Sequence, residues 1–264
     1  MRRVTPCCRK SKGVCDMAVH LKPEETRGYH SPESLGLVYC SAERVEIAGT
    51  ELLKSGDEEL CLVCIAGKAF YQCGGESGEA VLCDMLYVPV RSDIILSGNG
   101  AVFMRFGAPC SRQYQFKHIS FSEVNGDSRH KVYGKAENGT LRDVWNFIDE
   151  KFGSGRFLTG ICFGRDGGWT AWPPHEHGAE REEVYVYFNM GESFGIQCVY
   201  NDLDQAEAHV VREGHLIAIP EGYHPNCGCP CGGIRYVYCM VSVKEGDRDF
   251  MNLRTQKIYG DRLE

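Results

Sequence analysis

The sequence lacks the features of a membrane protein, a secreted protein and a nucleic-acid-binding protein. No segment approaches the roughly 20 apolar residues that a transmembrane helix requires. The first residues, MRRVTPCCRKSKGVCDM, contain no apolar central region of the kind found in secretory signals, so we expect a cytoplasmic protein. The formal net charge is −7, with 29 Lys and Arg against 36 Asp and Glu. We therefore expect no membrane partner and no nucleic-acid partner, because nucleic-acid phosphates require clustered Lys and Arg.

Cysteine, in contrast, is abundant, with 15 residues. Without a secretory signal we expect reduced thiols, most of them packing as small apolar groups inside strands. Cys61 and Cys64 match Cys-x-x-Cys, but a strand there would place them on opposite faces, and no second pair stands at zinc-ribbon spacing. Cys227, Cys229 and Cys231 share a segment that we interpret as a turn of small residues, with metal binding or oxidation as the alternative.

Short apolar runs at even spacing fill two regions of the chain, residues 36–107 and 156–245. Turn signals such as Gly74-Gly75 separate the runs. This rhythm predicts the short strands of a sandwich or barrel, not an alternation of helices and strands. We therefore expect an all-β chain built from two similar halves.

The segment between these regions has a different pattern. In TLRDVWNFIDEKF, residues 140–152, the apolar side chains Leu141, Val144, Trp145 and Ile148 stand at helical spacing. This spacing predicts one short helix that links the two halves.

Three histidines and one glutamate form the most informative pattern. His175 and His177 alternate, so on an extended strand their side chains point to the same face. Glu183 opens an alternating strand, and His224 follows a second short strand after the turn at residues 220–222. A single histidine is more often structural than a ligand, but three imidazoles and a carboxylate from separate strands indicate a divalent-metal site.

Several phrases around these residues resemble one family. PPHEH, EEVYVYF, GIQCVYND and PEGYHP are similar to the uronate ketol-isomerases of the cupin superfamily, which act on 5-deoxy-glucuronate in inositol breakdown and on 5-keto-4-deoxyuronate in pectin breakdown. EELCLVCIAGKA (58–69) is similar to the N-terminal half of the inositol enzyme, so the resemblance runs through most of the chain. Residues 1–35 carry no such match.

The resemblance implies a bicupin, with two tandem jelly-roll barrels and metal ligands in the second barrel alone. The expected division is a tail at 1–35, a metal-free barrel with a polar connection at 36–139, and the linking helix with the metal-binding barrel at 140–264. The resemblance also implies a homo-oligomer, and we expect the metal-free barrel at its interface.

The same resemblance implies a ligand set of His175, His177, Glu183 and His224. In cupins generally the carboxylate stands earlier, which would select Arg181 or Glu182, so Glu182 stays an alternative. Zinc is the expected ion, although Mn, Fe, Co and Ni suit the same ligands.

The implied activity is a metal-dependent aldose–ketose isomerisation of a deoxy-uronate, with 5-deoxy-glucuronate preferred over the pectin-derived ketouronate. A non-catalytic sugar-binding cupin and a cupin dioxygenase are the alternatives. The proton-transfer candidates are Tyr185, Tyr187 and Tyr223, with Gln197 as an orienting group, although each tyrosine could equally fill the barrel. Further candidates are Glu176 or Glu182 if turned inward, and Tyr236 and Tyr238; the candidate cations for the substrate carboxylate are Arg142, Arg181, Arg235 and Arg254.

Overall fold

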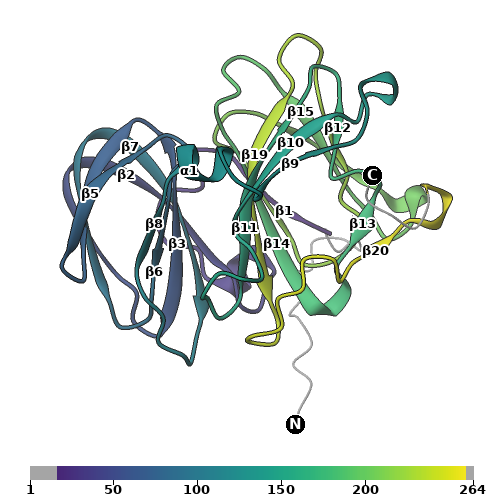
Figure 1. The fold of residues 1–264 in the computed structure, drawn as a ribbon. Coiled ribbons are helices and arrows are strands. Elements are labelled where there is room, and N and C mark those ends of the chain that lie inside the picture. The colour runs from purple at the N-terminus through teal and green to yellow at the C-terminus, as the bar shows by residue number, and fades with distance from the viewer. Residues whose placement is uncertain (1–16, 260–264) are drawn as a thin grey trace.

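The computed structural model of the chain describes residues 17–259. These residues form 20 strands and a single α-helix of five residues, α1 (Phe121–Asn125). Figure 1 shows two β-rich lobes, the N-terminal one in purple and blue and the C-terminal one in green and yellow. The all-β prediction is confirmed, while residues 1–16 of the predicted tail lie outside the described part. Among residues 17–259, no helix is long and apolar enough to cross a membrane.

The N-terminal lobe is one seven-stranded antiparallel sheet. Its longest strand, β7, pairs with β2 along its whole length, and its other edge pairs with β4 in the first part and with β3 in the second. Alternate side chains of these strands form an apolar core that includes Leu62, Ile94 and Phe103. The strands are β2 (Ser41–Lys54), β3 (Glu58–Ala66), β4 (Lys68–Cys73), β5 (Glu76–Val81), β6 (Met85–Val88), β7 (Asp93–Pro109) and β8 (Lys117–Ile119).

The C-terminal lobe contains a second seven-stranded sheet and two smaller sheets. The large sheet has the order β1-β17-β14-β19-β11-β10-β9, so β1 from the start of the chain joins the C-terminal lobe. Its strands are β1 (Val19–Leu21), β9 (His130–Tyr133), β10 (Arg142–Ile148), β11 (Phe157–Gly164), β14 (Arg181–Tyr187), β17 (Leu216–Ile219) and β19 (Ile234–Ser242). The small sheets comprise β12 (Trp169–Thr170), β15 (Gly195–Val199), β16 (Glu207–Val211) and β18 (Asn226–Gly228), and β13 (His175–Glu176) with β20 (Arg254–Thr255).

The predicted helix at residues 140–152 is wrong. Residues 142–148 form β10, which pairs with β9 on one side and with β11 on the other. Both faces of this strand are buried, so its apolar side chains form a nearly continuous run in which helical spacing arises by chance. Val, Trp, Phe and Ile favour a pleated, packed strand, and Trp145 and Phe147 enter the core between the two lobes.

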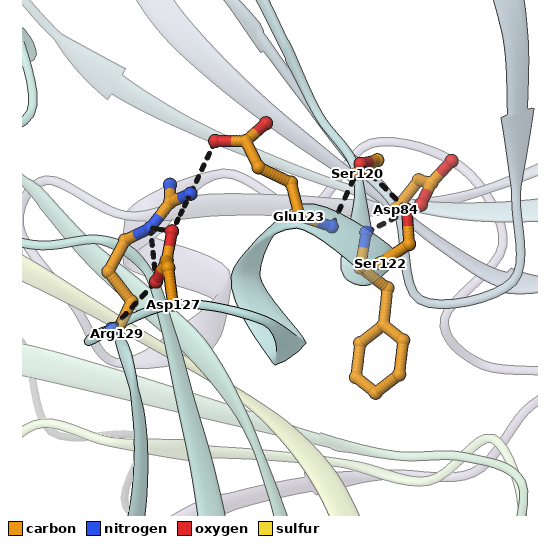
Figure 2. Close-up of polar contacts among 7 residues, drawn as sticks. Asp84, Ser120, Ser122, Glu123, Asp127 and Arg129 are labelled. Atoms are coloured by element: carbon orange, nitrogen blue, oxygen red, sulfur yellow. Dashed lines mark hydrogen bonds and ion pairs between the residues drawn. The ribbon is translucent and has the colours of Figure 1, made fainter.

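A short connection carries the chain from the first large sheet to the second. Ser120 caps α1 by accepting a hydrogen bond from the Glu123 backbone N–H at 3.2 Å, and Asp84 accepts one from the Phe121 N–H at 2.8 Å. After α1, the Arg129 guanidinium forms ion pairs with Asp127 and Glu123, as Figure 2 shows. These local polar contacts order the turn that leads into β9.

The two lobes share one apolar core, to which Tyr87 and Phe106 contribute from the first and Phe157 and Val186 from the second. Each lobe also contributes one buried glutamate that accepts hydrogen bonds from backbone N–H groups of the other lobe. Glu59 of β3 accepts from the backbone N–H groups of Gly155 and Arg156 at 2.7 and 2.6 Å.

The reciprocal contact is made by Glu182 of β14. Its carboxylate accepts from the backbone N–H groups of Val38, Tyr39 and Cys40, at 2.5, 3.0 and 3.1 Å. Burial raises the pKa of Glu182, and these three donors oppose that rise. The segment before β2 is therefore fastened to the strand that also carries Glu183.

Candidate metal centre and cavity

Three histidines converge at one end of the C-terminal lobe. His175 lies on β13, His177 follows it, and His224 lies in the connection between β17 and β18. Their ring centroids are 4.9 to 5.3 Å apart, and one nitrogen of each lies within 4.8 Å of the others. Within residues 17–259, this is the one group of three or more His, Cys, Asp or Glu side chains whose geometry could hold a metal ion.

Glu183 completes the cluster from the first half of β14. Its Oε2 atom lies 3.3 Å from His177 Nε2 and 3.0 Å from His224 Nε2. Neither contact has hydrogen-bond geometry, so these three buried atoms have no hydrogen-bond partner, and His177 Nδ1 also has none. Buried polar atoms are normally paired, and atoms that converge without pairing are arranged as the ligands of a divalent ion are.

Backbone carbonyls orient two of the rings. His175 Nδ1 lies 3.0 Å from the Pro173 carbonyl oxygen, and His224 Nδ1 lies 2.7 Å from that of Gly222. If each Nδ1 donates its proton there, Nε2 is left as the acceptor that a metal needs.

The protonation states suit a metal as well. Burial and the neighbouring imidazoles lower the pKa of His175, and burial lowers that of His177. Burial disfavours the charged form of Glu183, but His224 and His177 outweigh it and hold the pKa of this carboxyl far below its usual range. Burial likewise disfavours charged His224, and the Glu183 carboxylate overcomes this and raises its pKa. Ionised Glu183 beside neutral His175 and His177 matches the ligand states that a cation requires, whereas His224 would have to release its proton when a metal binds.

The two adjacent glutamates point to opposite faces of β14. Glu183 lies at the histidines, whereas Glu182 binds the backbone of residues 38–40. Arg181, the other residue at cupin spacing, donates to the carbonyl oxygens of Asn252 and Asp249. Of these three residues, the structure therefore brings Glu183 alone to the cluster.

The cluster opens into a partly enclosed cavity between β10, β14, β19 and the C-terminal segment. Its lining combines the candidate ligands with tyrosines, one arginine and apolar side chains. The lining residues are Tyr133, Arg142, Val144, Cys162, Ala171, His175, His177, Glu183, Tyr185, Tyr236, Tyr238, Met240, Phe250 and Leu253.

Of the four residues predicted to take part in catalysis, only Tyr185 lines this cavity. Its ring centroid is 5.9 Å from that of His224 and 4.6 Å from that of Tyr236. Burial raises the pKa of Tyr185 well above its ordinary value, and the neighbouring Glu183 charge acts in the same direction. The protonated phenol is suited to donate a hydrogen bond.

The structure does not bring the other three to the cavity. The Tyr187 hydroxyl donates to Gln197 Oε1 at 2.6 Å, and Gln197 Nε2 donates to the His224 carbonyl oxygen at 2.7 Å. These two hydrogen bonds hold the backbone of His224 in place. The Tyr223 ring packs against Tyr200, with centroids 5.6 Å apart.

Tyr238 of β19 lines the cavity through an unusual approach to β11. A Cβ atom at position 160 would lie 2.2 Å from the Tyr238 hydroxyl oxygen, so Gly160 leaves the space that this ring occupies. The hydroxyl donates across β11 to Asn146 Oδ1 at 2.5 Å. This second tyrosine is therefore fixed by a side chain of β10.

A C-terminal strap, residues 248–256, covers the cavity and was not foreseen from the sequence. Phe250 and Leu253 of the strap form part of the cavity wall. Its strand β20 pairs with β13, which places Thr255 opposite His175. Arg254 Nε lies 2.9 Å from Glu176, so this glutamate is turned to the strap. No local pattern could have revealed the contact, because the strap and β13 are far apart in the chain.

Among the four candidate cations, Arg142 lines the cavity. Arg254 is largely exposed and pairs with Glu176 and Glu180, and Arg235 donates to the Asn189 carbonyl oxygen. The cysteines among residues 17–259 are free thiols, with Cys229 Sγ 3.1 Å from Ser193 Oγ in the loop after His224.

Known sequences resemble the chain over most of its length. It is 30% identical over 221 residues to a protein of Geobacillus kaustophilus (strain HTA426) named 5-deoxy-glucuronate isomerase, a match that covers 74% of this chain and 76% of the relative. It is 23% identical over 193 residues to 4-deoxy-L-threo-5-hexosulose-uronate ketol-isomerase of Cereibacter sphaeroides (strain ATCC 17029 / ATH 2.4.9), with 72% and 68% covered.

Solved structures with the same fold include an IolB-like protein from Salmonella typhimurium LT2. It superposes with a TM-score of 0.75 at 21% identity, covering 96% of each chain. An oxalate decarboxylase of Lactobacillus farciminis in complex with formate has a TM-score of 0.61 at 12% identity, covering 93% of this chain and 90% of the other.

The family model named KduI/IolB matches residues 18–255, from β1 to the C-terminal strap. The match thus includes both large sheets, all four residues of the candidate metal cluster and the strap as far as Thr255. The chain belongs to the KduI/IolB family.

Proposed function

We propose that this protein is a cytoplasmic, metal-dependent aldose–ketose isomerase whose substrate is 5-deoxy-glucuronate. The observation that carries the proposal is the buried cluster of His175, His177, His224 and Glu183, whose unpaired atoms meet at a cavity. Relatives that cover most of the chain are named 5-deoxy-glucuronate isomerase. The pectin-derived ketouronate is the alternative substrate, since other relatives carry that name.

The four residues of the cluster would hold the ion, with zinc as the expected species. Four protein ligands leave one or two positions for substrate, as a catalytic metal requires. When bound, a divalent ion would polarise the carbonyl and neighbouring hydroxyl groups of a sugar and so make the C–H bond of the hydroxyl-bearing carbon more acidic.

Tyr185 would donate a hydrogen bond to a substrate oxygen as the proton moves between neighbouring carbons. Tyr185 lines the cavity beside the cluster, and the Tyr238 hydroxyl is already committed to Asn146. We expect Tyr185→Phe to lower kcat about 10- to 100-fold, since one directed donor is lost, while metal content stays unchanged. Steady-state kinetics with elemental analysis of the same samples measure both quantities.

The deciding experiment gives the metal-loaded protein each of the two uronates and follows ketose or aldose formation by NMR. Conversion of 5-deoxy-glucuronate supports the proposal, and conversion of the ketouronate alone transfers it to the alternative substrate. Conversion of neither, with sugar acid bound but unchanged, would indicate a non-catalytic sugar-binding cupin. Oxygen uptake with a small acid would indicate a dioxygenase.

We also infer that the two large sheets are two tandem cupin barrels. Because β9 (His130–Tyr133) pairs with β10, we place the division near residue 130 and not at residues 139 and 140, where the sequence analysis expected it. The antiparallel strand order of each sheet and the likeness to cupin-fold structures support this division. We further propose a homo-oligomer with the N-terminal lobe at its interface, because Leu52 and Phe70 are 51% and 62% exposed on that sheet. A light-scattering mass of one chain at micromolar concentration would contradict the oligomer.

A further inference from the structure

Arg142 is a buried cation inside the candidate active-site cavity. It begins β10, and its side chain lies on the same face as Val144, which also lines the cavity. The residue is 4% exposed. Asp143, on the opposite face, is engaged with His130 at 2.9 Å and with Arg165 at 2.5 Å. The Asp143 carboxylate, although adjacent in sequence, therefore does not neutralise the charge of Arg142.

The partners of Arg142 orient its guanidinium without neutralising it. Nη1 donates to the Thr140 carbonyl oxygen at 2.9 Å and Nη2 to that of Trp172 at 2.6 Å. The Tyr133 ring lies beside the group, with Cζ 5.5 Å from the ring centroid. These contacts use two of the five N–H donors that an arginine carries.

No carboxylate among residues 17–259 forms an ion pair with Arg142, whereas Arg105, a buried arginine of the first large sheet, pairs with Glu58 at 2.6 Å. Arg181 of β14 is also buried and also donates to two backbone carbonyls, but it does not line the cavity. A buried charge without a counter-charge is costly, and at the edge of a cavity a bound anion can supply that counter-charge. The guanidinium borders the cavity, so an anion that enters the cavity can reach it.

We propose that Arg142 is the subsite that recognises the carboxylate of the substrate and so selects sugar acids over neutral sugars. This inference rests on the proposed function, in which the histidine cluster holds the carbonyl end of the sugar. In a six-carbon uronate the carboxylate stands at the other end of the carbon chain. The planar fork of an arginine matches a carboxylate with two parallel hydrogen bonds, and the Tyr133 ring and the two carbonyls fix the plane of the fork.

Arg142 also has a structural contact that the test must separate from recognition. The Trp172 carbonyl that it binds lies three residues before His175, so loss of the arginine could displace a metal ligand. Metal content is therefore measured beside ligand binding. A purely positioning role predicts loss of metal and equal loss of acidic and neutral ligands.

The experiment is isothermal calorimetry of the metal-loaded protein with glucuronate and with the neutral, isosteric glucuronamide. The wild type is expected to bind the acid at least about 10-fold more tightly than the amide. Arg142→Gln should weaken the acid about 10- to 100-fold, since a charge-assisted bidentate contact is lost, and leave the amide and the metal content unchanged. Arg142→Lys should retain part of the preference, because it keeps the charge but not the fork.

Arg235→Gln is the matched control, because Arg235 also donates to a backbone carbonyl but does not line the cavity, and it should change neither affinity. Persistence of the acid preference in Arg142→Gln would overturn the inference, as would equal weakening of acid and amide or a wild type that binds neither. Calorimetry needs no turnover. An Arg142-dependent preference in a protein that isomerises neither uronate would keep the subsite and reject the proposed reaction.

Discussion

The two large sheets have the same number of strands but opposite interiors. In the N-terminal lobe the inward positions are occupied by apolar side chains such as Leu62, Ile94 and Phe103, all fully buried. In the C-terminal lobe, inward positions of β14 and β19 carry Glu183, Tyr185 and Tyr238 around a cavity. The comparison teaches that the sheet supplies a frame, whereas the side chains on its inner face decide between a packed core and a site.

The connections between strands also differ between the two lobes. The N-terminal lobe turns tightly at Gly67, where φ is +68° and a Cβ would lie 2.8 Å from the Gly100 carbonyl oxygen. Such a turn leaves no room for a ligand-bearing loop. In the C-terminal lobe, the long connection from β12 to β14 carries His175 and His177, and the strap returns over it. The candidate metal cluster thus depends on connections that the first lobe does not have.

The largest expected effect comes from removing one imidazole of the cluster. His224→Ala should abolish isomerisation and lower metal affinity by at least about 100-fold, since even changes beyond the ligands cost 10- to 100-fold. The fold should survive, because apolar burial and not the ion holds both sheets. Elemental analysis, the uronate assay and circular dichroism check these outcomes; full metal occupancy in the variant would refute the two-segment site.

The opposite result is expected in the other lobe. Phe103→Ala should lower the free energy of unfolding by about 3–5 kcal/mol, because Phe103 is fully buried and its loss leaves a cavity. Metal affinity of the folded protein should not change. Urea denaturation and metal titration measure the two effects, and a parallel loss of metal affinity would show that the interiors are coupled.

A sharper contrast comes from two neighbouring residues of β14. Glu183→Gln should weaken metal binding about 10- to 100-fold, since it removes the charge at the cluster. Glu182→Gln should leave metal affinity within a few-fold and instead cost about 1–3 kcal/mol of stability, because its amide group would face backbone N–H donors. Reversal of these two results in metal titration and urea denaturation would make Glu182 the ligand.

The smallest effect concerns β1, the strand that the start of the chain adds to the C-terminal sheet. His20 Nε2 lies 2.8 Å from His215 Nδ1. Burial lowers the pKa of His20 to about 4, and the nearby His215, His209 and Lys22 contribute to this decrease, whereas Glu25 opposes it. The unfolded chain takes up this proton near pH 6.5 and the folded chain only near pH 4. Between these values the unfolded state binds more protons, so stability falls as the pH decreases.

We expect this loss to be about 1–2 kcal/mol between pH 7.5 and pH 4.5, less than the full shift implies because the imidazole is partly exposed. Urea denaturation of the wild type and His20→Gln at the two pH values tests it. The variant should lose less stability than the wild type on acidification. An equal loss in both proteins would remove His20 as the cause.

Local sequence was sufficient for the strand-rich character of the chain and for the residue types of the cluster. Alternation in EVYVYF predicts the buried strand β14, and His-x-His followed by a strand predicts side chains that share one face. It failed at residues 140–152, because a strand buried on both faces has no alternation by which to distinguish it from a helix.

What only the tertiary structure decided is which side chains meet. The sequence could not choose among Arg142, Arg181, Arg235 and Arg254, nor between Glu182 and Glu183 on pattern alone. The choice depends on which face of β14 meets the backbone of residues 38–40, and on the position of β10 in the sheet, between β11 and β9. Both are contacts between segments separated by many residues, and such pairings are fixed by the packing of the whole chain and not by the local preferences that a sequence pattern records.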